Sequence, residues 1–434
     1  MIPVNRYHYP EQYYQKSLET LETALNTVPA YRSWKDADPG ADAPVDERYN
    51  AMPELTKEMI RDNFPAGLVP NHRDIQEGLK SEEIEYTFTS GTTSERVVNI
   101  WDQRWWDDAE AESWKHNAHL AGLSYPQKTA KLASSLNVGI SCEEDLPTEY
   151  RMVGNTLYLN EKINLIQWQP RHFLRMAREL EEYKPVILEA NPSLLARLAW
   201  WAIDEGVKLY SPAVIVFTYE FISKIHLSAI RSVFASPLVS SFGTTETGFV
   251  LQECEKGFLH QNIDFCRIDF HPLKDQYGGP ELGRILVTTF GNPWNTVIRF
   301  DTGDIVRLHP DNNCPCGRNE GLIACGVEGR VTNFTFTTEG IPVTTAALDA
   351  ALAGIEGIRD YHLEQNNPDK YELQIMIKGD SDKIKAECEN ALKTLYGKRG
   401  FYDVKILPNI YPGPAGKFRR TQMNFGFNLK ELFV

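Results

Sequence analysis

The chain has 434 residues, with 45 basic and 59 acidic side chains and a formal net charge of -14. This length predicts two or three domains that need no disulfides to fold, and the acidic balance argues against a general nucleic-acid binder, because phosphate contacts require basic patches. No stretch approaches the roughly 18 apolar residues of a membrane-spanning helix, and the first residues do not read as a signal peptide. Seven cysteines at irregular positions favour a reducing compartment. We therefore expect a cytoplasmic protein without a membrane or nucleic-acid partner.

The first 280 residues alternate between helical and strand patterns. Residues 1–80 are predicted to be helices joined by a loop rich in Pro, Asp and Ala. Further on, short β-branched runs predict strands, and amphipathic stretches between them predict helices. Strand and helix alternation favours a mainly parallel sheet covered by helices. The predicted strands are 84–89, 131–136, 185–190, 213–217 and 237–242, and the predicted helices include 171–183 and 192–206.

After residue 280 the pattern becomes richer in strands. Three consecutive strands with turns between them are predicted at 283–290, 296–303 and 304–310. The last hundred residues predict a strand at 371–379, a helix at 381–398 and a strand at 402–409, which is typical of a small α+β domain. We therefore predict an α/β chain with a domain boundary near residue 330. It would consist of a large N-terminal region, 1–330 (helical start 1–80, mixed α/β core 81–280, β-rich part 281–330), and a small C-terminal domain, 331–434.

The segment TSGTTSER (89–96) follows the first predicted strand. Small hydroxyl residues and a glycine after a strand can wrap a phosphate with backbone N–H and side-chain O–H donors. Clusters of this composition are also common in plain turns. Taken alone, this segment is therefore compatible with a phosphate-binding loop and with an ordinary turn. It is not a Walker A motif, because no Gly-Lys-Ser/Thr follows.

Further motifs follow in a fixed order and give the loop a context. They are MPELTKEMIRDNFPAGLVP (52–70), SFGTTETG (241–248), RFDTGD (299–304), CPCGR (314–318), GR (329–330) and PAGKFRR (414–420). Together with TSGTT, this series resembles the adenylate-forming acyl-CoA synthetase superfamily, and within it the phenylacetate–CoA ligase-like group. The resemblance covers about residues 50–434. It implies that a carboxylate attacks the α-phosphate of Mg·ATP to give an acyl-adenylate, and that a thiol, usually that of coenzyme A, then displaces AMP.

The resemblance assigns the phosphates and magnesium to two loops. Thr89, Ser90, Gly91, Thr92 and Thr93 would hold the β- and γ-phosphates of ATP. The sequence then departs from the family pattern, because Ser94, Glu95 and Arg96 stand where the family usually has Gly-x-Pro followed soon by Lys. In the second motif Phe242 would stack near adenine, Gly243 and Thr244 would belong to the nucleotide-binding residues, Thr245 would bind the α-phosphate, and Glu246 would hold Mg²⁺, a hard ion that prefers carboxylate oxygens.

The remaining motifs imply contacts with ribose, the reacting groups and the acceptor. Asp304 would accept both ribose hydroxyl protons, and Arg330 would reach the ribose or a phosphate. Lys417 would neutralise charge during adenylation and lies on a C-terminal domain that the family rotates between its two half-reactions. The hinge would fall at residues 331–333, and Gly340 would let the pantetheine of coenzyme A approach closely.

The family places its acyl pocket near three loops of this chain. Asn137, Val138, Gly139 and Tyr219 are therefore candidate pocket residues, together with Phe242. Glu220 lies in the segment that would cover adenine. The side chains of these candidate pocket residues suggest a pocket that has room for an aromatic acid.

Cys314 and Cys316 lie in a polar, turn-rich loop and could chelate a soft cation as thiolates. Tetrahedral zinc needs two further ligands, and Cys254 and His260 supply a pair six positions apart. Some members of the resembled group hold zinc with such a set, so we predict a structural zinc site. Two cysteines are reserve ligands, Cys266 and Cys325. Unmetallated free thiols are the alternative.

The leading hypothesis is an ATP-dependent ligase that converts an aryl or arylacetic acid into its coenzyme A thioester. A second hypothesis keeps the adenylation step but passes the acyl group to an amine, a hydroxyl or a carrier-protein thiol. A third is an inactive binding or scaffold homologue. A homodimer is a further expectation, because two-fold dimers are the commonest soluble oligomers.

Overall fold

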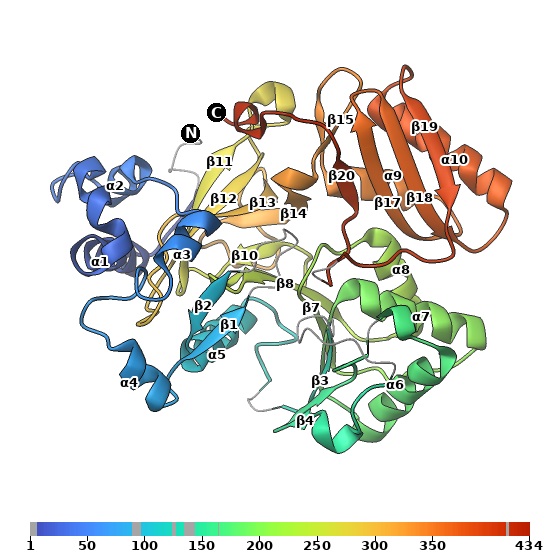
Figure 1. Ribbon diagram of the computed structural model, residues 1–434, viewed down its shortest axis with the longest axis horizontal. Helices are drawn as coiled ribbons and strands as arrows, with labels where there is room; N and C mark the ends of the chain where they lie inside the picture. Colours follow the sequence, from blue (N-terminus) through green and yellow to red (C-terminus); the bar gives the residue numbers. More distant parts are fainter. Residues whose placement is uncertain (1–6, 89–96, 124–126, 134–143, 164, 414–415) are drawn as a thin grey trace. The chain divides into compact units, whose positions relative to one another are not determined.

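The computed structural model describes residues 7–88, 97–123, 127–133, 144–163, 165–413 and 416–434 (Figure 1). Its backbone contacts divide the chain into two units, which we describe separately. The first unit comprises Met1–Ala121, Ser241–Gly326 and Phe433–Val434, and the second comprises Gly122–Ser240 and Val327–Leu432. This division groups residues after 327 with residues 122–240, whereas the sequence alone suggests a boundary near residue 330. No helix in the described ranges is long and apolar enough to cross a membrane.

The first unit begins with helices, as the sequence predicts. They pack around a core that includes Leu21, Tyr31 and Phe300. The hydroxyl of Tyr31 donates to the carbonyl oxygen of Thr296 (2.9 Å) and accepts from the amide of Ile298 (3.1 Å). These two hydrogen bonds connect the N-terminal helical region to residues 296–298. The helical elements are α1 (Glu11–Thr27), η2 (Pro29–Ala37), α2 (Val45–Ala51), α3 (Lys57–Asn63) and α4 (Ile75–Lys80).

Two strands flank the predicted phosphate loop. Strand β1 (Glu85–Phe88) confirms the strand predicted at 84–89 and pairs antiparallel with β2 (Val98–Trp101), so that Phe88 lies opposite Val98. Helix α5 (Gln103–Trp114) follows directly, and its N-cap Asp102 accepts hydrogen bonds from the first-turn amides. Residues 89–96, which join β1 to β2, lie outside the described residues.

The other strands of the first unit form one sheet in the order β11-β12-β13-β14-β10-β9-β8. Their bounds are β8 (Leu238–Thr244, of which 241–244 belong to this unit), β9 (Gly248–Glu253), β10 (Leu259–Gln261), β11 (Cys266–Pro272), β12 (Leu282–Thr289), β13 (Phe300–Leu308) and β14 (Ile323–Arg330, of which 323–326 belong to this unit). A 3-10 turn, η6 (Asp275–Tyr277), lies between β11 and β12. The predicted strand 283–290 corresponds to β12.

One prediction in this sheet is wrong. Strands predicted separately at 296–303 and 304–310 are a single strand, β13, that starts only at Phe300. Arg299 has a φ of 49°, and its amide donates to the hydroxyl of Thr288, so residues 296–299 do not extend the strand. Gly303, at the point where the sequence predicts a turn between two strands, has a φ of 72°. The register of β12 and β13 shifts between Arg284 and Leu286, and such a bulge places a turn-like sequence inside a strand.

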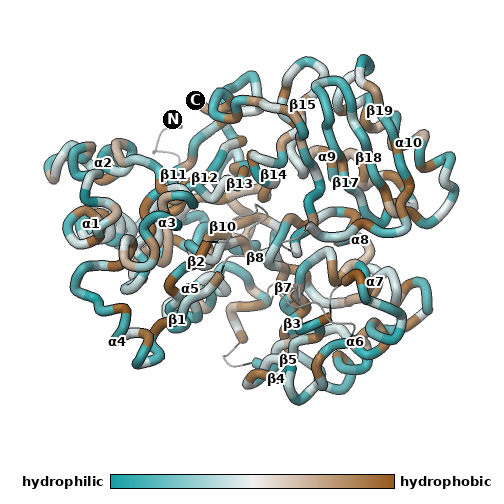
Figure 2. The backbone as a smooth tube through the Cα atoms, in the orientation of Figure 1, coloured by the Kyte–Doolittle hydropathy of each residue, from teal (hydrophilic) through white to brown (hydrophobic). Residues whose placement is uncertain are grey.

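The second unit contains the parallel sheet that the sequence predicts. Strand order is β8-β7-β6-β3-β5-β4, and the pairs β8–β7, β7–β6, β6–β3 and β3–β5 are parallel. All four residues of β7 are buried, and the hydropathy colouring in Figure 2 shows brown segments along β7 and α7. The strands are β3 (Thr129–Leu132), β4 (Met152–Val153), β5 (Thr156–Tyr158), β6 (Ile187–Ala190) and β7 (Val214–Phe217), and the helices are α6 (Pro170–Tyr183), α7 (Pro192–Glu205) and α8 (Lys224–Val233), with short turns η4 (Thr148–Tyr150) and η5 (Leu165–Gln167).

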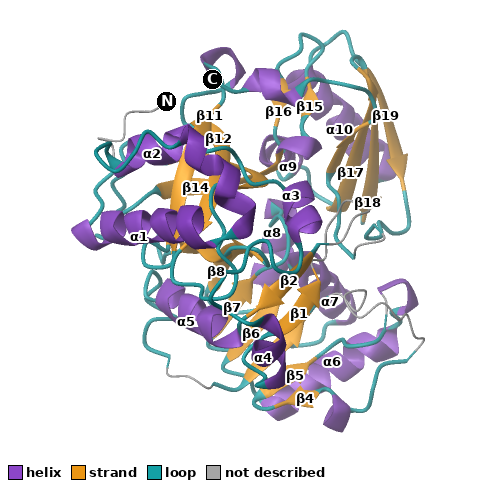
Figure 3. Cartoon of the chain, turned by 60° about the vertical axis from the view of Figure 1, so that its left-hand side comes forward, coloured by secondary structure: helices purple, strands orange, loops and turns teal. Residues whose placement is uncertain are grey.

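Residues after 330 form a four-stranded sheet with two helices (Figure 3). Strand order is β19-β18-β17-β20, and Cys388 of the following helix is buried in the same apolar core. The elements are η7 (Val331–Asn333), β15 (Thr335–Phe336), β16 (Pro342–Val343), α9 (Thr345–Leu352), β17 (Ile358–Asn367), β18 (Lys370–Ile377), α10 (Ser381–Tyr396), β19 (Phe401–Ile406), β20 (Thr421–Met423) and η8 (Leu429–Leu432).

A buried charge cluster lies within the second unit, centred on Asp360 of β17. This carboxylate pairs with Arg420, with Arg197 of α7 at 3.0 Å, and with His226 of α8 at 3.3 Å. Burial alone would raise the pKa of Asp360, but Arg420 and the other partners outweigh it and hold the pKa well below its usual range. The cluster therefore connects residues 190–230 to the C-terminal sheet by charge as well as by apolar packing.

Candidate functional site

The motif at 241–248 forms the tight connection between β8 and β9 in the first unit. A Cβ on Gly243 would lie 2.1 Å from the carbonyl oxygen of Gly248, so only glycine allows the two backbones to approach this closely. The hydroxyls of Thr244 and Thr247 lie 3.0 Å apart. Phe242 and Thr245 are half-buried, so the sequence-predicted residues of this motif do lie on one turn.

Glu246 at this turn is a buried carboxylate, with 3% of its surface exposed. Its Oε1 accepts no hydrogen bond from the described residues, and Lys57 Nζ lies 3.7 Å away from it. A buried carboxylate with so little compensation is costly in water-excluded surroundings. The arrangement fits a group that binds a cation, because a divalent ion would supply the missing charge.

Lys57 is a functional candidate that the sequence reasoning did not single out. It is the first residue of α3, whose N-cap Thr56 accepts from the amide of Met59 at 3.2 Å. Leu55 exchanges backbone hydrogen bonds with the strand that starts at Phe300, which fixes where α3 begins. Lys57 lies inside the segment 52–70, which is one of the motifs that carry the family resemblance. Its place in that motif is the one sequence feature that could have marked it as a candidate.

Asp304 lies in the middle of β13 and is 7% exposed. Its amide donates to the hydroxyl of Thr302 at 3.1 Å. Asp301, the neighbouring carboxylate of the same motif, is instead paired with Arg284 at 2.7 Å and accepts from the amide of Gly303. Asp301 is thus held by contacts within the sheet, whereas Asp304, the residue predicted to contact ribose, is the more buried of the two carboxylates.

In the second unit Glu220 and Lys417 belong to one hydrogen-bonded region. One carboxylate oxygen of Glu220 accepts from the hydroxyl of Ser193, and the other accepts from the amide of Phe418 at 3.1 Å. Gly416 has a φ of 74° and turns the chain just before Lys417, which is half-buried. Glu220 therefore positions the segment that carries the lysine.

Arg330 and Gly340 mark the start of the C-terminal residues in the same unit. Arg330 is the last residue of β14 and is half-buried. Gly340 has a φ of 81° in the turn between β15 and β16, and a Cβ there would meet nothing within 4 Å. Open space beside Gly340 is compatible with the close approach of a ligand.

Several predicted site residues lie outside the described residues. They are Thr89, Ser90, Gly91, Thr92 and Thr93 of the phosphate loop, together with Ser94, Glu95 and Arg96, and Asn137, Val138 and Gly139 of the acyl pocket. The structure describes the two other pocket candidates, Tyr219 and Phe242. The hydroxyl of Tyr219 donates to Oε1 of Glu189 at 2.6 Å.

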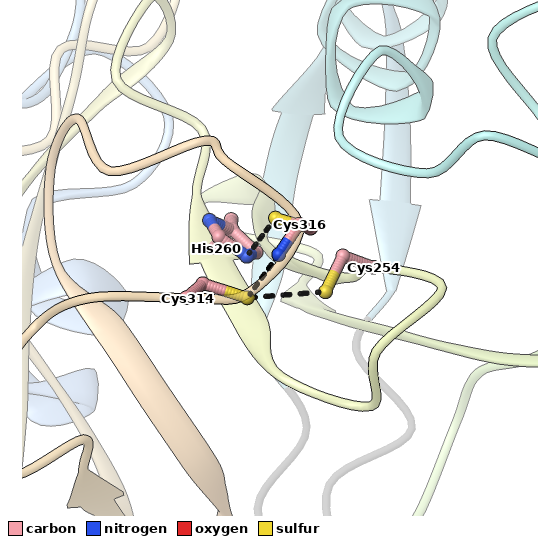
Figure 4. Close-up of side chains that lie close together, drawn as sticks. All are labelled: Cys254, His260, Cys314 and Cys316. Atoms are coloured by element: carbon pink, nitrogen blue, oxygen red, sulfur yellow. Dashed lines mark hydrogen bonds between the residues drawn. The ribbon is translucent and has the colours of Figure 1, made fainter.

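Cys254, His260, Cys314 and Cys316 come together in the first unit (Figure 4). Their ligand atoms all lie within 4.8 Å of one another. The Sγ atoms of Cys254 and Cys314 are 3.7 Å apart, and Sγ of Cys316 is 3.4 Å from Nε2 of His260. Burial raises the pKa of the Cys314 thiol to about 12 and lowers the pKa of His260 to about 4. This donor set fits a tetrahedral site for a soft divalent metal.

Two further contacts support the cluster from the side. The ring of His116 stacks on that of His260, with centroids 5.9 Å apart and an interplanar angle of 8°. Arg318 pairs with Glu255 at 2.5 Å, which ties the loop after Cys316 to the one after Cys254. The local sequence around His116 does not indicate this contact, because His260 lies 144 residues further along the chain.

Comparisons with known proteins identify the fold. No family model and no curated protein matches the chain. Among solved structures, 2-hydroxyisobutyryl-CoA ligase in the postadenylation state with R3-HIB-AMP has a TM-score of 0.72 at 17% identity, covering 97% of this chain and 93% of that one. The same ligase with 2-HIB-AMP and CoA in the thioesterification state has a TM-score of 0.56 at 18% identity, covering 98% and 94%. An anthranilate CoA ligase with anthranoyl-AMP has a TM-score of 0.51 at 15% identity, covering 78% and 66%.

The chain therefore has the fold of the AMP-forming acyl-CoA ligases. The mixed α/β architecture with a small C-terminal α+β part agrees with the prediction from sequence. The sequence motifs fall at a tight turn, in a bulged strand and on a C-terminal loop of this fold.

Proposed function

We propose that the protein is an ATP-dependent carboxylate ligase that works through an acyl-adenylate. A carboxylate oxygen of the acid attacks the α-phosphorus of ATP, a new O–P bond forms, and the bond to the β-phosphate breaks to release pyrophosphate. In the second half-reaction a thiol sulfur attacks the acyl carbon, forms the C–S bond and releases AMP, while the thiol loses its proton.

The observation that carries this proposal is the buried carboxylate of Glu246 at the 241–248 turn of this fold. Structures with the same fold contain acyl-adenylates, and Glu246 is a suitable ligand for the Mg²⁺ that accompanies ATP. Bound magnesium would neutralise charge on the phosphates. Thr245, on the same turn, would donate to the α-phosphate, and Lys57 would share the charge of Glu246.

The remaining nucleotide contacts are assigned by matching motifs. Asp304 would bind the ribose hydroxyls, Phe242 would stack on adenine, and Arg330 would reach the ribose or a phosphate. Lys417 would balance the negative charge between the carboxylate and the α-phosphate in the transition state. The phosphate loop at 89–93 would donate backbone and hydroxyl hydrogen bonds to the β- and γ-phosphates.

For the second half-reaction we propose coenzyme A as acceptor. The fold is shared with a ligase whose structure contains CoA, and the turn at Gly340 offers open space for a pantetheine chain. Residues 331–434 would form the mobile domain that turns between the two half-reactions. Transfer to an amine, a hydroxyl or a carrier-protein thiol is the second candidate, because these acceptors use the same adenylate.

We also propose that Cys254, His260, Cys314 and Cys316 bind a structural zinc ion. A site with four protein ligands has no open position for a substrate, which indicates a structural role. Zinc would connect the segment at 254–260 to the loop at 314–316. We further propose an aryl or arylacetic acid as the substrate, as the sequence suggests. Tyr219 and residues 137–139 are the candidates for lining its pocket.

Exchange of labelled pyrophosphate into ATP tests the proposed function. The exchange should require a carboxylic acid and magnesium, and it should not require coenzyme A. A panel of aromatic and aliphatic acids would identify the substrate class, and mass detection of a CoA thioester would separate the two acceptor hypotheses. If no acid in the panel supports exchange, the chain is an inactive homologue and the proposed function is wrong.

A further inference from the structure

Three polar side chains of the second unit form a cluster, and the proposed mechanism gives no role to two of them, Lys131 and Glu189. The ammonium of Lys131 pairs with Oε2 of Glu189 at 2.7 Å. The hydroxyl of Tyr219 donates to Oε1 of the same carboxylate at 2.6 Å, and the hydroxyl of Thr218 lies 3.4 Å from it. We call Lys131, Glu189 and Tyr219 the carboxyl-edge cluster.

The cluster lies where α/β sheets bind their ligands. Lys131 and Glu189 are paired in register on the parallel strands β3 and β6, each one residue before its strand ends. Tyr219 comes two residues after the end of β7, which is parallel to β6. Ligands of open parallel sheets bind beyond the carboxyl ends of the strands, and all three side chains lie at that end of this sheet.

The backbone of Tyr219 indicates that its position is imposed by the surrounding structure. Its φ is 79°, a left-handed conformation that is unusual for a bulky residue. Such strain persists where the surrounding structure fixes it, and it is concentrated at functional sites. Here the strained backbone aims the tyrosine hydroxyl at Glu189.

The cluster is ionised and partly accessible. Glu189 raises the pKa of Lys131, whereas burial opposes the ionisation of Glu189 but is outweighed by Lys131, so the pKa of Glu189 is lowered. The side chains of Lys131 and Glu189 are 29% and 16% exposed. An ammonium has three donors, and Glu189 accepts one of them.

The cluster is also connected to the segment that carries Lys417. Tyr219 is followed directly by Glu220, and Oε2 of Glu220 accepts from the amide of Phe418, the residue after Lys417. In the proposed function Lys417 meets the reacting carboxylate. The cluster is therefore linked through two residues to the group that would act on the acid.

We propose that the carboxyl-edge cluster is a specificity subsite that binds a hydroxyl group on the carboxylic acid, and so selects a hydroxylated acid. The substrate oxygen would accept from Lys131, and its proton would be donated to Glu189. A second carboxylate fits less well, because the charges of Lys131 and Glu189 already cancel and Glu189 would repel it. This inference rests on the proposed function and narrows its substrate class.

Matched acid pairs test the subsite. Pyrophosphate exchange is measured for acids that differ only in a hydroxyl group: benzoate with its hydroxybenzoates, phenylacetate with its hydroxyphenylacetates, and short aliphatic acids with their 2- and 3-hydroxy forms. For one pair or more, kcat/KM should favour the hydroxylated acid by about 10- to 100-fold, as one charge-assisted hydrogen bond would give.

Two variants locate the source of that preference. In the double variant Lys131→Met/Glu189→Gln the paired charges are removed together, which avoids leaving one buried charge alone. The preference should fall to within about threefold of unity, given the loss of that bond. Tyr219→Phe removes one hydroxyl without changing the shape of the ring and should lower the preference for the hydroxylated acid partially. If the double variant does not fold, Tyr219→Phe is the variant that tests the subsite. Lys128→Met, on the exposed Lys128 near the ring of Tyr183, is the control and should keep the preference.

The outcomes separate the two proposals. Exchange at equal rates for both members of every pair, or a preference that survives in the cluster variants, would overturn the subsite and leave the ligase standing. A preference for acids with a second carboxylate would also overturn it. No exchange with any acid would overturn both proposals.

Discussion

At the scale of single residues, the proposed function depends on one buried carboxylate and on a few cations, which we consider within their own units. Glu246 is buried and has Lys57 3.7 Å away, while Lys417 lies on a glycine-bounded loop held by Glu220. The formal net charge of -14 argues against polynucleotides, but a single nucleotide needs only local donors. Because these groups act locally, each can be tested by a single substitution.

Lys417→Ala should slow adenylation by about 100- to 1,000-fold, as the loss of one preorganised charge in a transition state does. The measurement is pyrophosphate exchange at saturating acid and ATP. Lys430→Ala removes an exposed lysine of the same region and should leave the rate unchanged. Full activity of Lys417→Ala would show that the assignment of this lysine is wrong.

Glu246→Gln should raise the magnesium concentration needed for half-maximal exchange by roughly tenfold or more, because a neutral amide binds a hard cation less well than a carboxylate. The titration is carried out at constant ATP. Glu58→Gln, which changes an exposed carboxylate on α3, is the matched control. An unchanged magnesium requirement would remove Glu246 from the site.

At the scale of elements, two clusters connect segments that are distant in sequence. The Cys/His cluster joins the ends of β9 and β10 to the loop between β13 and β14. The Asp360 cluster joins α7 and α8 to β17. Each cluster fixes the relation between elements that the chain brings together only after folding.

The zinc prediction can be tested by elemental analysis and thermal unfolding. Purified protein should contain about one zinc per chain, and Cys314→Ser should reduce this to under about half, with a Tm lower by roughly 5 °C or more. Cys325→Ser is the control, because Cys325 is exposed and lies outside the cluster. Equal zinc content in the two variants would contradict the assignment.

Asp360→Asn should lower the free energy of unfolding by about 3–5 kcal/mol, because it leaves Arg420 and Arg197 buried without their shared carboxylate. The folded-state pKa of Asp360 lies below its unfolded value of about 3.9. Its contribution is therefore fully present above about pH 5 and is lost as the pH falls through the unfolded pKa towards the folded one. Urea unfolding at pH 7 and pH 3 measures both effects.

The acid-side loss of stability should be smaller in Asp360→Asn than in the unmodified protein, since the titrating group is gone. Asp403→Asn changes an aspartate whose side chain is 61% exposed and should alter the free energy of unfolding by less than about 0.5 kcal/mol. Equal unfolding free energies for the two variants would show that the Asp360 cluster contributes little.

At the scale of the whole molecule, the chain has the fold of enzymes that perform two half-reactions. If coenzyme A is the acceptor, incubation with acid and ATP alone should leave about one acyl-adenylate per chain, and added coenzyme A should convert it to a thioester with release of AMP. Mass spectrometry measures both products. Desulfo-coenzyme A, which lacks the thiol, should release nothing, and conversion by amines alone would favour the second acceptor hypothesis.

Local patterns predicted much of the secondary structure. Short β-branched runs located strands such as β6 and β7, and the 3.6-residue period located α6, α7 and α10, because both depend on neighbours a few positions away. The same reasoning failed at residues 296–310. There Gly303 suggested a turn, and only the pairing of β12 with β13 shows that it lies in a bulged strand.

The sequence by itself determined the kinds of groups and their order along the chain. The resemblance of its motifs to a known family singled out Glu246, Asp304 and Lys417, and ligand chemistry together with that resemblance singled out the four Cys/His residues. The tertiary structure alone decided which distant groups meet. It placed His116 on His260, Lys57 beside Glu246, and Lys131 with Tyr219 on Glu189. These contacts depend on sheet order and loop closure, and no local periodicity encodes them.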